Sequence, residues 1–248
     1  MLPVTYRLGE LVDNRHDIPQ LMRSPVEDLQ QRAQRIAAKR SSMWVYRSVR
    51  RTIMTVLYPY FRVKRRGQEH LDISGPVIVA PVHRSNLDTP LLSGMSRRRL
   101  RALSKESLFS NKYFGAFLAA LGAFPVRRGA ADREAMREAV KMLEAGEQIV
   151  VFPEGGRQTG PRVESVFDGM SYLASRTGAV IVPVGIAGTE AAMATGTRLP
   201  RPVRVAMVAG PPIRPPEGRM TRPQMSRFSE EVRKRLQEVF DEAQSLTG

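Results

Sequence analysis

The sequence contains no cysteine, and its 248 residues include only three histidines, His16, His70 and His83. Without cysteine the chain can form no disulfide, no cysteine nucleophile and no thiolate metal site, which is consistent with a reducing cytosol. The sequence also lacks the HExxH pattern, and so few histidines disfavour a histidine-rich metal site. We therefore expect neither a bound metal nor thiol chemistry.

Three motifs that mark nucleotide-binding and serine-hydrolase sites are absent as well. The chain has no GxxxxGK(S/T) phosphate loop, no GxGxxG dinucleotide fingerprint and no GxSxG nucleophile elbow. Nucleotide cofactors and a serine acyl-enzyme intermediate are therefore unsupported, and we expect the protein to use no cofactor.

Long apolar segments are missing too. The longest uncharged runs, residues 113–126 and 177–189, contain Gly and Pro and fall short of the roughly 18 apolar residues of a spanning helix. Residues 1–17 mix acidic and basic side chains and lack the apolar core of a signal peptide. We therefore expect no transmembrane helix and no secretion signal, and a peripheral location on the cytoplasmic face of the cell membrane.

Acidic residues are absent from one long segment. Between Arg32 and Arg66 the chain carries eleven Arg or Lys residues and no Asp or Glu, and the whole sequence has a net charge of +15. Such a charge calls for an anionic partner: a phospholipid surface, a nucleic acid or a phosphorylated substrate. No helix-turn-helix, zinc module or RNA-binding sheet signature accompanies the charge, so we expect no nucleic acid partner.

Residues 43–58 have the spacing of an amphipathic helix that ends at Pro59. Its apolar arc consists of Val45, Tyr46, Val49, Ile53, Val56, Leu57 and Tyr60. Trp44 lies near its start, and a neighbouring arc is basic, with Arg47, Arg50 and Arg51. Two interpretations are equally supported: the helix lies on an anionic membrane surface, or it packs on its own domain with the basic arc in solvent.

The rest of the chain alternates between β and α patterns. Apolar runs predict strands at residues 61–65, 77–82, 99–103, 123–127, 148–153, 180–186 and 203–208. Helical spacing predicts helices at residues 111–121, 133–145, 169–176 and 225–240. We expect an α/β fold with a mostly parallel central sheet flanked by helices. Residues 1–60 would form an N-terminal arm, irregular to about residue 26, with basic amphipathic membrane-associating helices, and residues 61–248 the α/β domain.

One strand is followed closely by a histidine and an aspartate. In the stretch PVIVAPVHRSNLDTP the apolar run stops at His83, and Asp88 follows five positions later. Pro90 indicates a helix start with Asp88 or Thr89 as cap, or else Ser85 and Asp88 form a capping box. In either register the turn can return the carboxylate to the imidazole, where it would fix the tautomer for proton transfer. Taken alone, the spacing is better explained by a helix cap and a strand end.

Two later strand ends carry arginines. The stretch LGAFPVRRG delivers Arg127 and Arg128 to the end of a strand, where open α/β sheets bind ligands, although a solvated pair of arginines is equally common. In FPEGGR, Glu154 and Arg157 flank two glycines that would let the backbone approach an anion. The alternative is a plain tight turn in which Glu154 and Arg157 pair with each other.

Together with the apolar strand IVPVGI, these stretches resemble the four blocks of the glycerolipid acyltransferase family. The blocks HRSNLD, GAFPVRR, FPEGGR and IVPVGI follow the family order over residues 76–187, and the similarity is greatest to bacterial 1-acyl-sn-glycerol-3-phosphate acyltransferases. The resemblance implies that His83 is the general base and Asp88 its orienting partner. It further implies a substrate-binding set of Lys105, Arg127, Arg128, Glu154, Gly155, Gly156, Arg157 and Pro183.

The sequence departs from the family pattern at three positions. Arg127 stands where many members have Asp, Gly156 where Thr or Ser is usual, and Asp168 where Lys is common. These changes bear on the identity of the acceptor more than on the chemistry.

The resemblance implies acyl transfer from acyl-CoA or an acyl carrier protein, as co-substrate, to a lysophospholipid hydroxyl, with 1-acyl-sn-glycerol-3-phosphate giving phosphatidic acid. The anionic membrane surface would contact residues 32–66, and the apolar helix at residues 111–121 is a candidate wall for the acyl chain. Two alternatives remain open. One is another polar-lipid acceptor, such as a glycolipid or a lyso-aminolipid, and the other is a non-catalytic basic membrane-binding protein.

Overall fold

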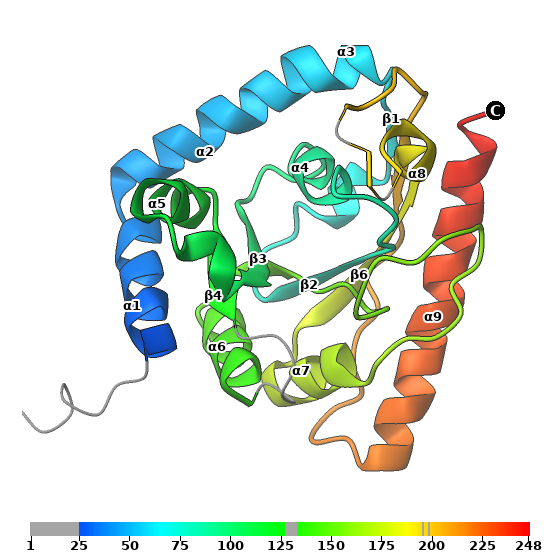
Figure 1. Cartoon of the computed structure of the whole chain (residues 1–248). Helices are drawn as coiled ribbons and strands as arrows, with labels where there is room; N and C mark the ends of the chain where they lie inside the picture. Colours follow the sequence, from blue (N-terminus) through cyan, green and yellow to red (C-terminus); the bar gives the residue numbers. More distant parts are fainter. Residues whose placement is uncertain (1–24, 127–132, 195, 198) are drawn as a thin grey trace, which may run out of the picture.

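The computed structural model describes residues 25–126, 133–194, 196–197 and 199–248, which fold around one sheet (Figure 1). Among these residues seven strands pair in the order β1-β7-β6-β2-β5-β3-β4. Neighbouring strands are parallel except for β6 and β7. The strands are β1 (Lys64–Arg66), β2 (Val77–Pro81), β3 (Leu100–Lys105), β4 (Ala123–Val126), β5 (Gln148–Val150), β6 (Val180–Ala187) and β7 (Ala206–Ala209). The expected α/β fold with a mostly parallel sheet is confirmed.

Helices cover both faces of this sheet. They are α4 (Asp88–Leu92), α5 (Lys112–Ala120), α6 (Arg133–Glu144), α7 (Gly169–Thr177), α8 (Thr189–Ala192) and α9 (Arg222–Ser245), with short 3-10 turns η2 (Gln68–His70) and η3 (Glu106–Phe109). Every residue of β2 is buried, as expected of a strand with no charged side chain and a layer on each face. Val77 and Val79 point into the core shared with α4, while Ile78 and Ala80 point into the core shared with α6 and α7.

The long C-terminal helix α9 contributes to both cores. Leu236 and Phe240 pack on the α4 side, and Phe228 and Val232 pack on the α6 and α7 side. The apolar stripe predicted for this helix is therefore core packing. In Figure 1, α9 runs along one side of the sheet, opposite the N-terminal helices.

The N-terminal helices form an arch along the other side of the domain (Figure 1). They are α1 (Pro25–Ala37) and α2 (Arg40–Thr52), followed by a π-helical turn, η1 (Ile53–Leu57), and α3 (Tyr58–Tyr60). The prediction that Pro59 ends the helix is wrong, because Pro59 lies inside α3. The π-helical turn ends at Leu57, two residues before Pro59, which lacks an amide donor. Tyr46 of α2 and Ile53 of η1 are buried against the domain, whereas Val56 and Tyr60 at the far end of the predicted apolar arc are exposed.

Some strand boundaries differ from the sequence-based expectation. β5 ends at Val150, three residues before the predicted end. The Val151 N–H still donates to the Val79 carbonyl, at 2.9 Å, and the chain then leaves the sheet so that Phe152 can stack on His83. No helix in the part of the chain that the structure describes is both long and apolar enough to cross a bilayer.

Candidate active site

His83 and Asp88 meet directly after β2. The His83 Nδ1 atom lies 2.9 Å from Asp88 Oδ2, and the Asp88 side chain is fully buried. A carboxylate at Nδ1 fixes the tautomer that carries the proton there, which leaves Nε2 as a lone-pair base. The His83 side chain retains 16% of its exposure, so a ligand can reach it. The pairing expected from the His-x4-Asp spacing is therefore present.

One of the two predicted registers made Asp88 the cap of the following helix. This prediction is wrong, because the Asp88 side chain does not cap that helix. It lies inside the first turn of α4, and its Oδ2 accepts the backbone N–H groups of Arg84 and Ser85, each at 2.7 Å. The bond to Ser85 is one half of the capping box that the second register predicted. Because the same oxygen holds the turn and the imidazole, the geometry of His83 depends on this one carboxylate.

The His83 ring is held on a second side as well. It stacks on Phe152 with ring centroids 3.9 Å apart and an interplanar angle of 23°. Its backbone N–H donates to Glu154 Oε2 at 3.1 Å, and its carbonyl accepts from the Gln158 N–H at 2.9 Å. Side chain and backbone are therefore both fixed, which is the preorganisation that proton transfer requires.

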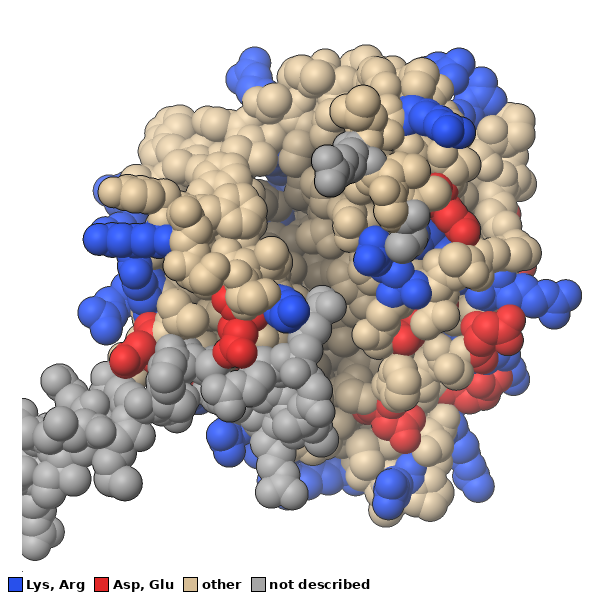
Figure 2. Space-filling model, in the orientation of Figure 1, with Lys and Arg blue, Asp and Glu red and all other residues tan. Residues whose placement is uncertain are grey.

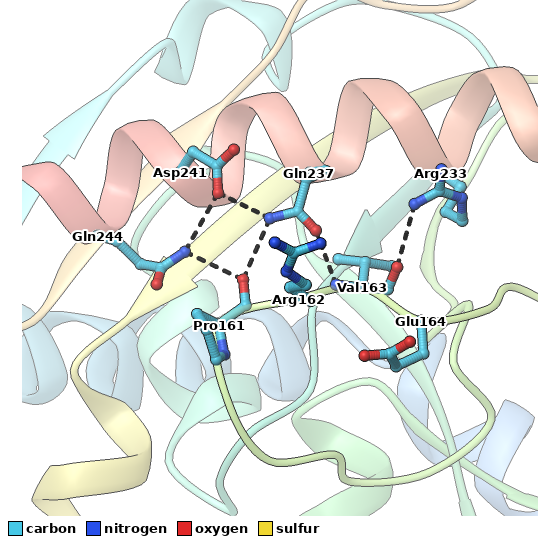
Figure 3. Close-up of a pocket in the computed structure, with 8 residues that line it drawn as sticks. All are labelled: Pro161, Arg162, Val163, Glu164, Arg233, Gln237, Asp241 and Gln244. Carbon is cyan, nitrogen blue, oxygen red and sulfur yellow. Dashed lines mark hydrogen bonds between the residues drawn. The ribbon is translucent and has the colours of Figure 1, made fainter.

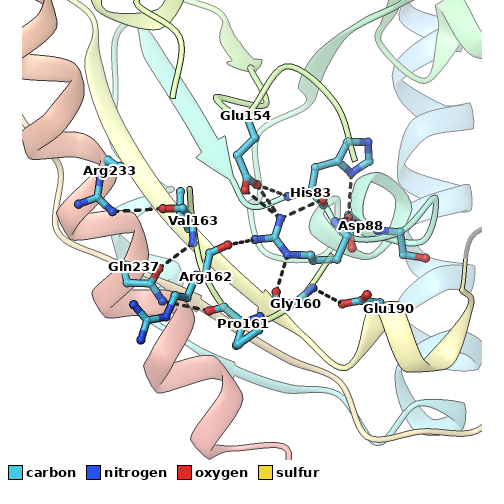
Figure 4. A network of polar contacts seen from close by, with 12 residues as sticks. His83, Asp88, Glu154, Gly160, Pro161, Arg162, Val163, Glu190, Arg233 and Gln237 are labelled. Carbon is cyan, nitrogen blue, oxygen red and sulfur yellow. Dashed lines mark hydrogen bonds and ion pairs between the residues drawn. The ribbon is translucent and has the colours of Figure 1, made fainter. Parts of the chain in front are cut away.

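Arg84 is the centre of a buried polar network next to His83; its partners Glu154, Gly160 and Arg162 are labelled in Figure 4. Its Nη1 donates to both carboxylate oxygens of Glu154, at 3.0 and 2.8 Å. Nη1 also donates to the His83 carbonyl at 3.1 Å, while Nε and Nη2 donate to the carbonyls of Gly160 and Arg162. The two side chains are only 2% and 1% exposed, so the ion pair has little contact with solvent.

Sequence reasoning missed Arg84 and assigned Glu154 a different partner. The alternative in which Glu154 pairs with Arg157 is wrong, since Arg84 takes the carboxylate. Glu154 also does not contact a substrate, because it is buried and both oxygens are engaged. One signal could have found the pair: Arg84 follows a buried strand and needs a buried acceptor, and FPEGGR supplies a glutamate at the end of another strand.

The segment after FPEGGR is held from outside by α9 (Figure 3). Gln237 accepts the Val163 N–H at 2.7 Å and donates to the Pro161 carbonyl at 3.1 Å. Arg233 donates to the Val163 carbonyl at 3.1 Å, and the groove of about 760 Å³ beside these residues is lined by polar groups already bonded to the loop. Residues 160–163 are thus fixed between Arg84 on the inside and α9 on the outside.

The two glycines of FPEGGR have different surroundings. Gly155 has a left-handed φ of 72°, and a Cβ there would lie 2.6 Å from the Phe167 ring. Glycine is therefore required at position 155 by the backbone conformation and by the packing of Phe167. At Gly156 a Cβ would meet no atom within 4 Å, so this position faces open space.

The remaining candidate residues differ in their positions. Lys105 is the exposed last residue of β3, and Arg157 is exposed after the glycine turn. Arg127 and Arg128 follow β4 and lie outside the described residues. Pro183 is buried in β6 opposite Ala80, beside the strand that leads to His83.

Asp168 also has a structural role. Its carboxylate accepts the hydroxyls of Ser229, at 2.6 Å, and Ser226, at 3.1 Å, both from α9. The departure from lysine at this position is thus explained by a bond that ties the start of α7 to α9.

An apolar cavity of about 300 Å³ lies between α2, α5 and the sheet. Thr89 and Pro90, which directly follow Asp88, form part of its wall, so the cavity adjoins the histidine corner. Phe117, Leu118 and Leu121 line it from the α5 side, as the sequence led us to expect for this helix. Tyr46 lines it from α2, and burial raises the pKa of its hydroxyl, which stays neutral and bonds to the backbone around residues 98–100.

Comparison with known proteins gives a consistent result. The profile of the family described as Acyltransferase matches residues 62–187, half of the chain. A 1-acyl-sn-glycerol-3-phosphate acyltransferase of Bacillus subtilis is 28% identical over 152 residues, covering 61% of this chain and 73% of that protein. A chloroplastic 1-acyl-sn-glycerol-3-phosphate acyltransferase of Arabidopsis thaliana is 27% identical over 144 residues, covering 57% of this chain and 40% of that protein.

A solved structure agrees in fold. The crystal structure of the 1-acyl-sn-glycerophosphate acyltransferase PlsC from Thermotoga maritima superposes with a TM-score of 0.67 at 24% identity, covering 87% of this chain and 89% of that one. The chain spans only about two fifths of the length of the plant relatives it matches. The family match includes the histidine corner, the arginine doublet and the glycine turn. The chain belongs to the acyltransferase family.

Proposed function

We propose that the protein transfers an acyl group from an acyl thioester to the free hydroxyl of a lysophospholipid, with 1-acyl-sn-glycerol-3-phosphate as acceptor and phosphatidic acid as product. The observation that carries the proposal is the 2.9 Å contact between His83 Nδ1 and buried Asp88, next to an apolar cavity. The matched relatives are 1-acyl-sn-glycerol-3-phosphate acyltransferases, which supports this acceptor. The thioester would be acyl-CoA or an acyl carrier protein.

The reaction needs a base and no covalent enzyme intermediate. His83 Nε2 takes the proton of the acceptor hydroxyl while Nδ1–H stays bonded to Asp88, whose charge stabilises the imidazolium. The acceptor oxygen attacks the thioester carbonyl carbon, a new C–O bond forms and the C–S bond breaks. The imidazolium then returns its proton to the thiolate, so that the products are an ester and a thiol and His83 is neutral again.

Cationic side chains at the sheet edge would hold the acceptor phosphate. Lys105 is the exposed last residue of β3, Arg157 is exposed in the segment that follows β5, and Arg127 and Arg128 follow β4 in sequence. Figure 2 shows a hollow between α5 and α8 with Lys or Arg side chains on its rim. Binding the phosphate there would aim the hydroxyl at the thioester, which accelerates the reaction by positioning.

The apolar cavity would hold one fatty chain. Its wall is formed mainly by apolar side chains of α2, α5 and the sheet, and its inner end lies beside Thr89 and Pro90. A cavity of about 300 Å³ is at the lower end of the range for small-molecule sites, which suits a chain that enters lengthwise.

The experiment that tests the proposal is transfer of a radiolabelled palmitoyl group from its CoA thioester to two acceptors. The first is lysophosphatidic acid and the second is monoacylglycerol, which has the same hydroxyl without the phosphate. We expect phosphatidic acid from the first and little product from the second. Equal rates with both acceptors would show that the enzyme does not recognise the phosphate. If neither acceptor gave product, a glycolipid or lyso-aminolipid acceptor would be tested next.

A further inference from the structure

The outer surface of α2 is basic and poor in apolar side chains, and the exposed Val56 and Tyr60 lie beyond it, in η1 and α3. The apolar arc that begins in α2 packs on the domain at Tyr46 and Ile53, which are buried. Trp44, 69% exposed, is the one large apolar side chain on the outer part of α2, beside exposed Arg47 and Arg51. This surface can attract anionic lipid headgroups, but Trp44 alone supplies little apolar area to insert among them.

A second surface, formed by η3 and α5, carries the exposed apolar side chains that the outer surface of α2 lacks. Leu108 of η3 and three aromatic residues of α5 are exposed, and we refer to Leu108, Tyr113, Phe114 and Phe117 as the α5 face. Tyr113 is 83% exposed, and Phe117 follows Phe114 and Tyr113 by three and four positions, so its ring lies between theirs on one side of the helix. The opposite side of α5 is covered by α1, through a small core that contains Ala33, Phe109 and Ala119.

The α5 face has the charge and location of a lipid contact. Its exposed neighbours Lys105 and Lys112 are basic, and α2, which packs against α5, lies within the segment without acidic residues. Figure 2 shows mainly uncharged side chains over α5, at one rim of the hollow. Phe117 is exposed on this face and also lines the apolar cavity, so the face is continuous with the cavity wall.

We propose that the α5 face inserts into the interfacial region of an anionic bilayer, while the basic outer surface of α2 contacts the headgroups. Tyrosine and phenylalanine are suited to this depth because they combine a large apolar area with a rigid ring, and tyrosine adds a hydroxyl at the polar boundary. A bilayer placed there would lie against the cavity at Phe117. The inference rests on the proposed function in one respect, since a lipid substrate would need a path from the bilayer into the apolar cavity.

The chain allows a direct test, because it has no cysteine and a single tryptophan. Tyr113→Cys carries an environment-sensitive fluorophore on the α5 face, and Tyr172→Cys carries it on α7 as the matched exposed control. Trp44 reports on α2 in the same samples. The probe is a vesicle of phosphatidylcholine and phosphatidylglycerol, with brominated phosphatidylcholine as a quencher of groups that reach the acyl chains.

We expect the label at position 113 to shift to shorter wavelength and to be quenched by brominated lipid, while the label at position 172 does neither. In the unlabelled chain, Tyr113→Ser with Phe114→Ser should lower the vesicle partition coefficient by about tenfold, since two partly exposed aromatic side chains no longer bury area in lipid. Tyr172→Ser should leave it unchanged.

Three results would overturn the inference. Trp44 could respond to vesicles while position 113 does not, which would assign binding to α2 alone. The label could be shielded before vesicles are added, with a dimer in sedimentation, which would assign the face to a second copy. The partition coefficient could also be unaffected by the double variant.

The proposed function is judged separately. Insertion is measured without turnover, so a chain that inserts but makes no phosphatidic acid would contradict the function and leave the inference standing. Conversely, an active chain whose position 113 stays in water would keep the function and remove the inference. If both hold, the double variant should lose turnover of vesicle-embedded acceptor and keep turnover of a water-soluble short-chain acceptor.

Discussion

The buried carboxylate of Asp88 fixes both the turn after β2 and the orientation of His83. A single oxygen accepts from two backbone N–H groups and from the His83 imidazole. The spacing of His83 and Asp88 allowed them to meet, but it was the resemblance of the four sequence blocks to the acyltransferase family that made this contact the expected one. The spacing could not show that Asp88 acts through the preceding turn, because two capping registers fit the same residues.

The Arg84–Glu154 pair is expected to be essential for stability and for activity. Arg84→Met leaves Glu154 buried without its counter-charge, which typically costs about 3–5 kcal/mol of unfolding free energy. Arg84→Met combined with Glu154→Gln should recover part of this loss, because no isolated charge remains. Urea unfolding of the two single variants and the double variant measures the coupling, and strictly additive losses would contradict it.

Arg157→Ala should weaken acceptor binding with a smaller effect on turnover. The side chain is exposed at the sheet edge and free of Glu154, so its removal should leave the fold intact. We expect the KM for lysophosphatidic acid to rise on the order of tenfold, the size of one charge-assisted hydrogen bond. Arg162→Ala, exposed on the same loop, is the control. An unchanged KM in Arg157→Ala would remove this residue from the phosphate site.

Tyr58 should make the protein sensitive to alkali. Burial raises the pKa of its hydroxyl above the ordinary value of 10.0, and the hydroxyl donates to the Leu91 carbonyl at 2.8 Å. The folded state therefore holds this proton more tightly than the unfolded state. Its contribution to stability is complete below the unfolded pKa and is lost as the pH rises through that value towards the folded pKa.

Tyr58→Phe tests this dependence. At neutral pH the variant should lose about 0.5–1.5 kcal/mol with the hydrogen bond to Leu91. Above the ordinary tyrosine pKa its urea midpoint should fall less steeply than that of the wild type, with Tyr46 supplying part of the remaining slope. Parallel curves for the two proteins across the alkaline range would contradict the account.

At the scale of elements, the order of strands and helices could be predicted, while their boundaries depended on tertiary contacts. β5 stops early because Phe152 leaves the sheet for the His83 ring, a contact with a residue 69 positions away in the sequence. The helix through Pro59 continues because a π-helical turn precedes the proline, and no local propensity indicates that turn. Helix α1 was missed entirely, since its packing on α5 and β4 is a long-range effect.

The C-terminal helix should influence the site through the loop it holds. Gln237→Ala removes two bonds to residues 161 and 163, and the loop that carries Arg157 loses its outer support. We expect a higher KM for the acceptor and a small loss of stability. Arg235→Ala, which removes an exposed pair with Glu238 on the same helix, should change neither. Equal KM values for the two variants would show that the loop does not need α9.

At the scale of the whole molecule, the sheet topology explains why blocks scattered over a hundred residues form one site. β2, β5, β3 and β4 are parallel neighbours, so the residues that follow them reach the same edge. This much could be predicted from alternating β and α patterns. The partner of Glu154, the support from α9 and the apolar cavity could not, because each depends on side chains brought together only by the complete fold.

The apolar arc of α2 and the α5 face show the same limit of prediction from sequence. Periodicity alone could not decide whether the apolar arc that begins in α2 meets a membrane or its own domain; Tyr46, Val49 and Ile53 pack on the domain, while Val56 and Tyr60 stay exposed. Residues 111–121 were predicted to form a helix of the domain, but nothing in the sequence indicated which side of that helix would remain exposed to solvent.

The most direct test of the account is palmitoyl transfer to lysophosphatidic acid by the wild type, His83→Ala and His70→Ala. His70 is the matched control, because it lies in η2 and contacts the Ala209 carbonyl away from the site. The account predicts product from the wild type and from His70→Ala, and loss of turnover by a factor on the order of 10²–10⁴ or more in folded His83→Ala. Turnover by folded His83→Ala at the wild-type rate would contradict it.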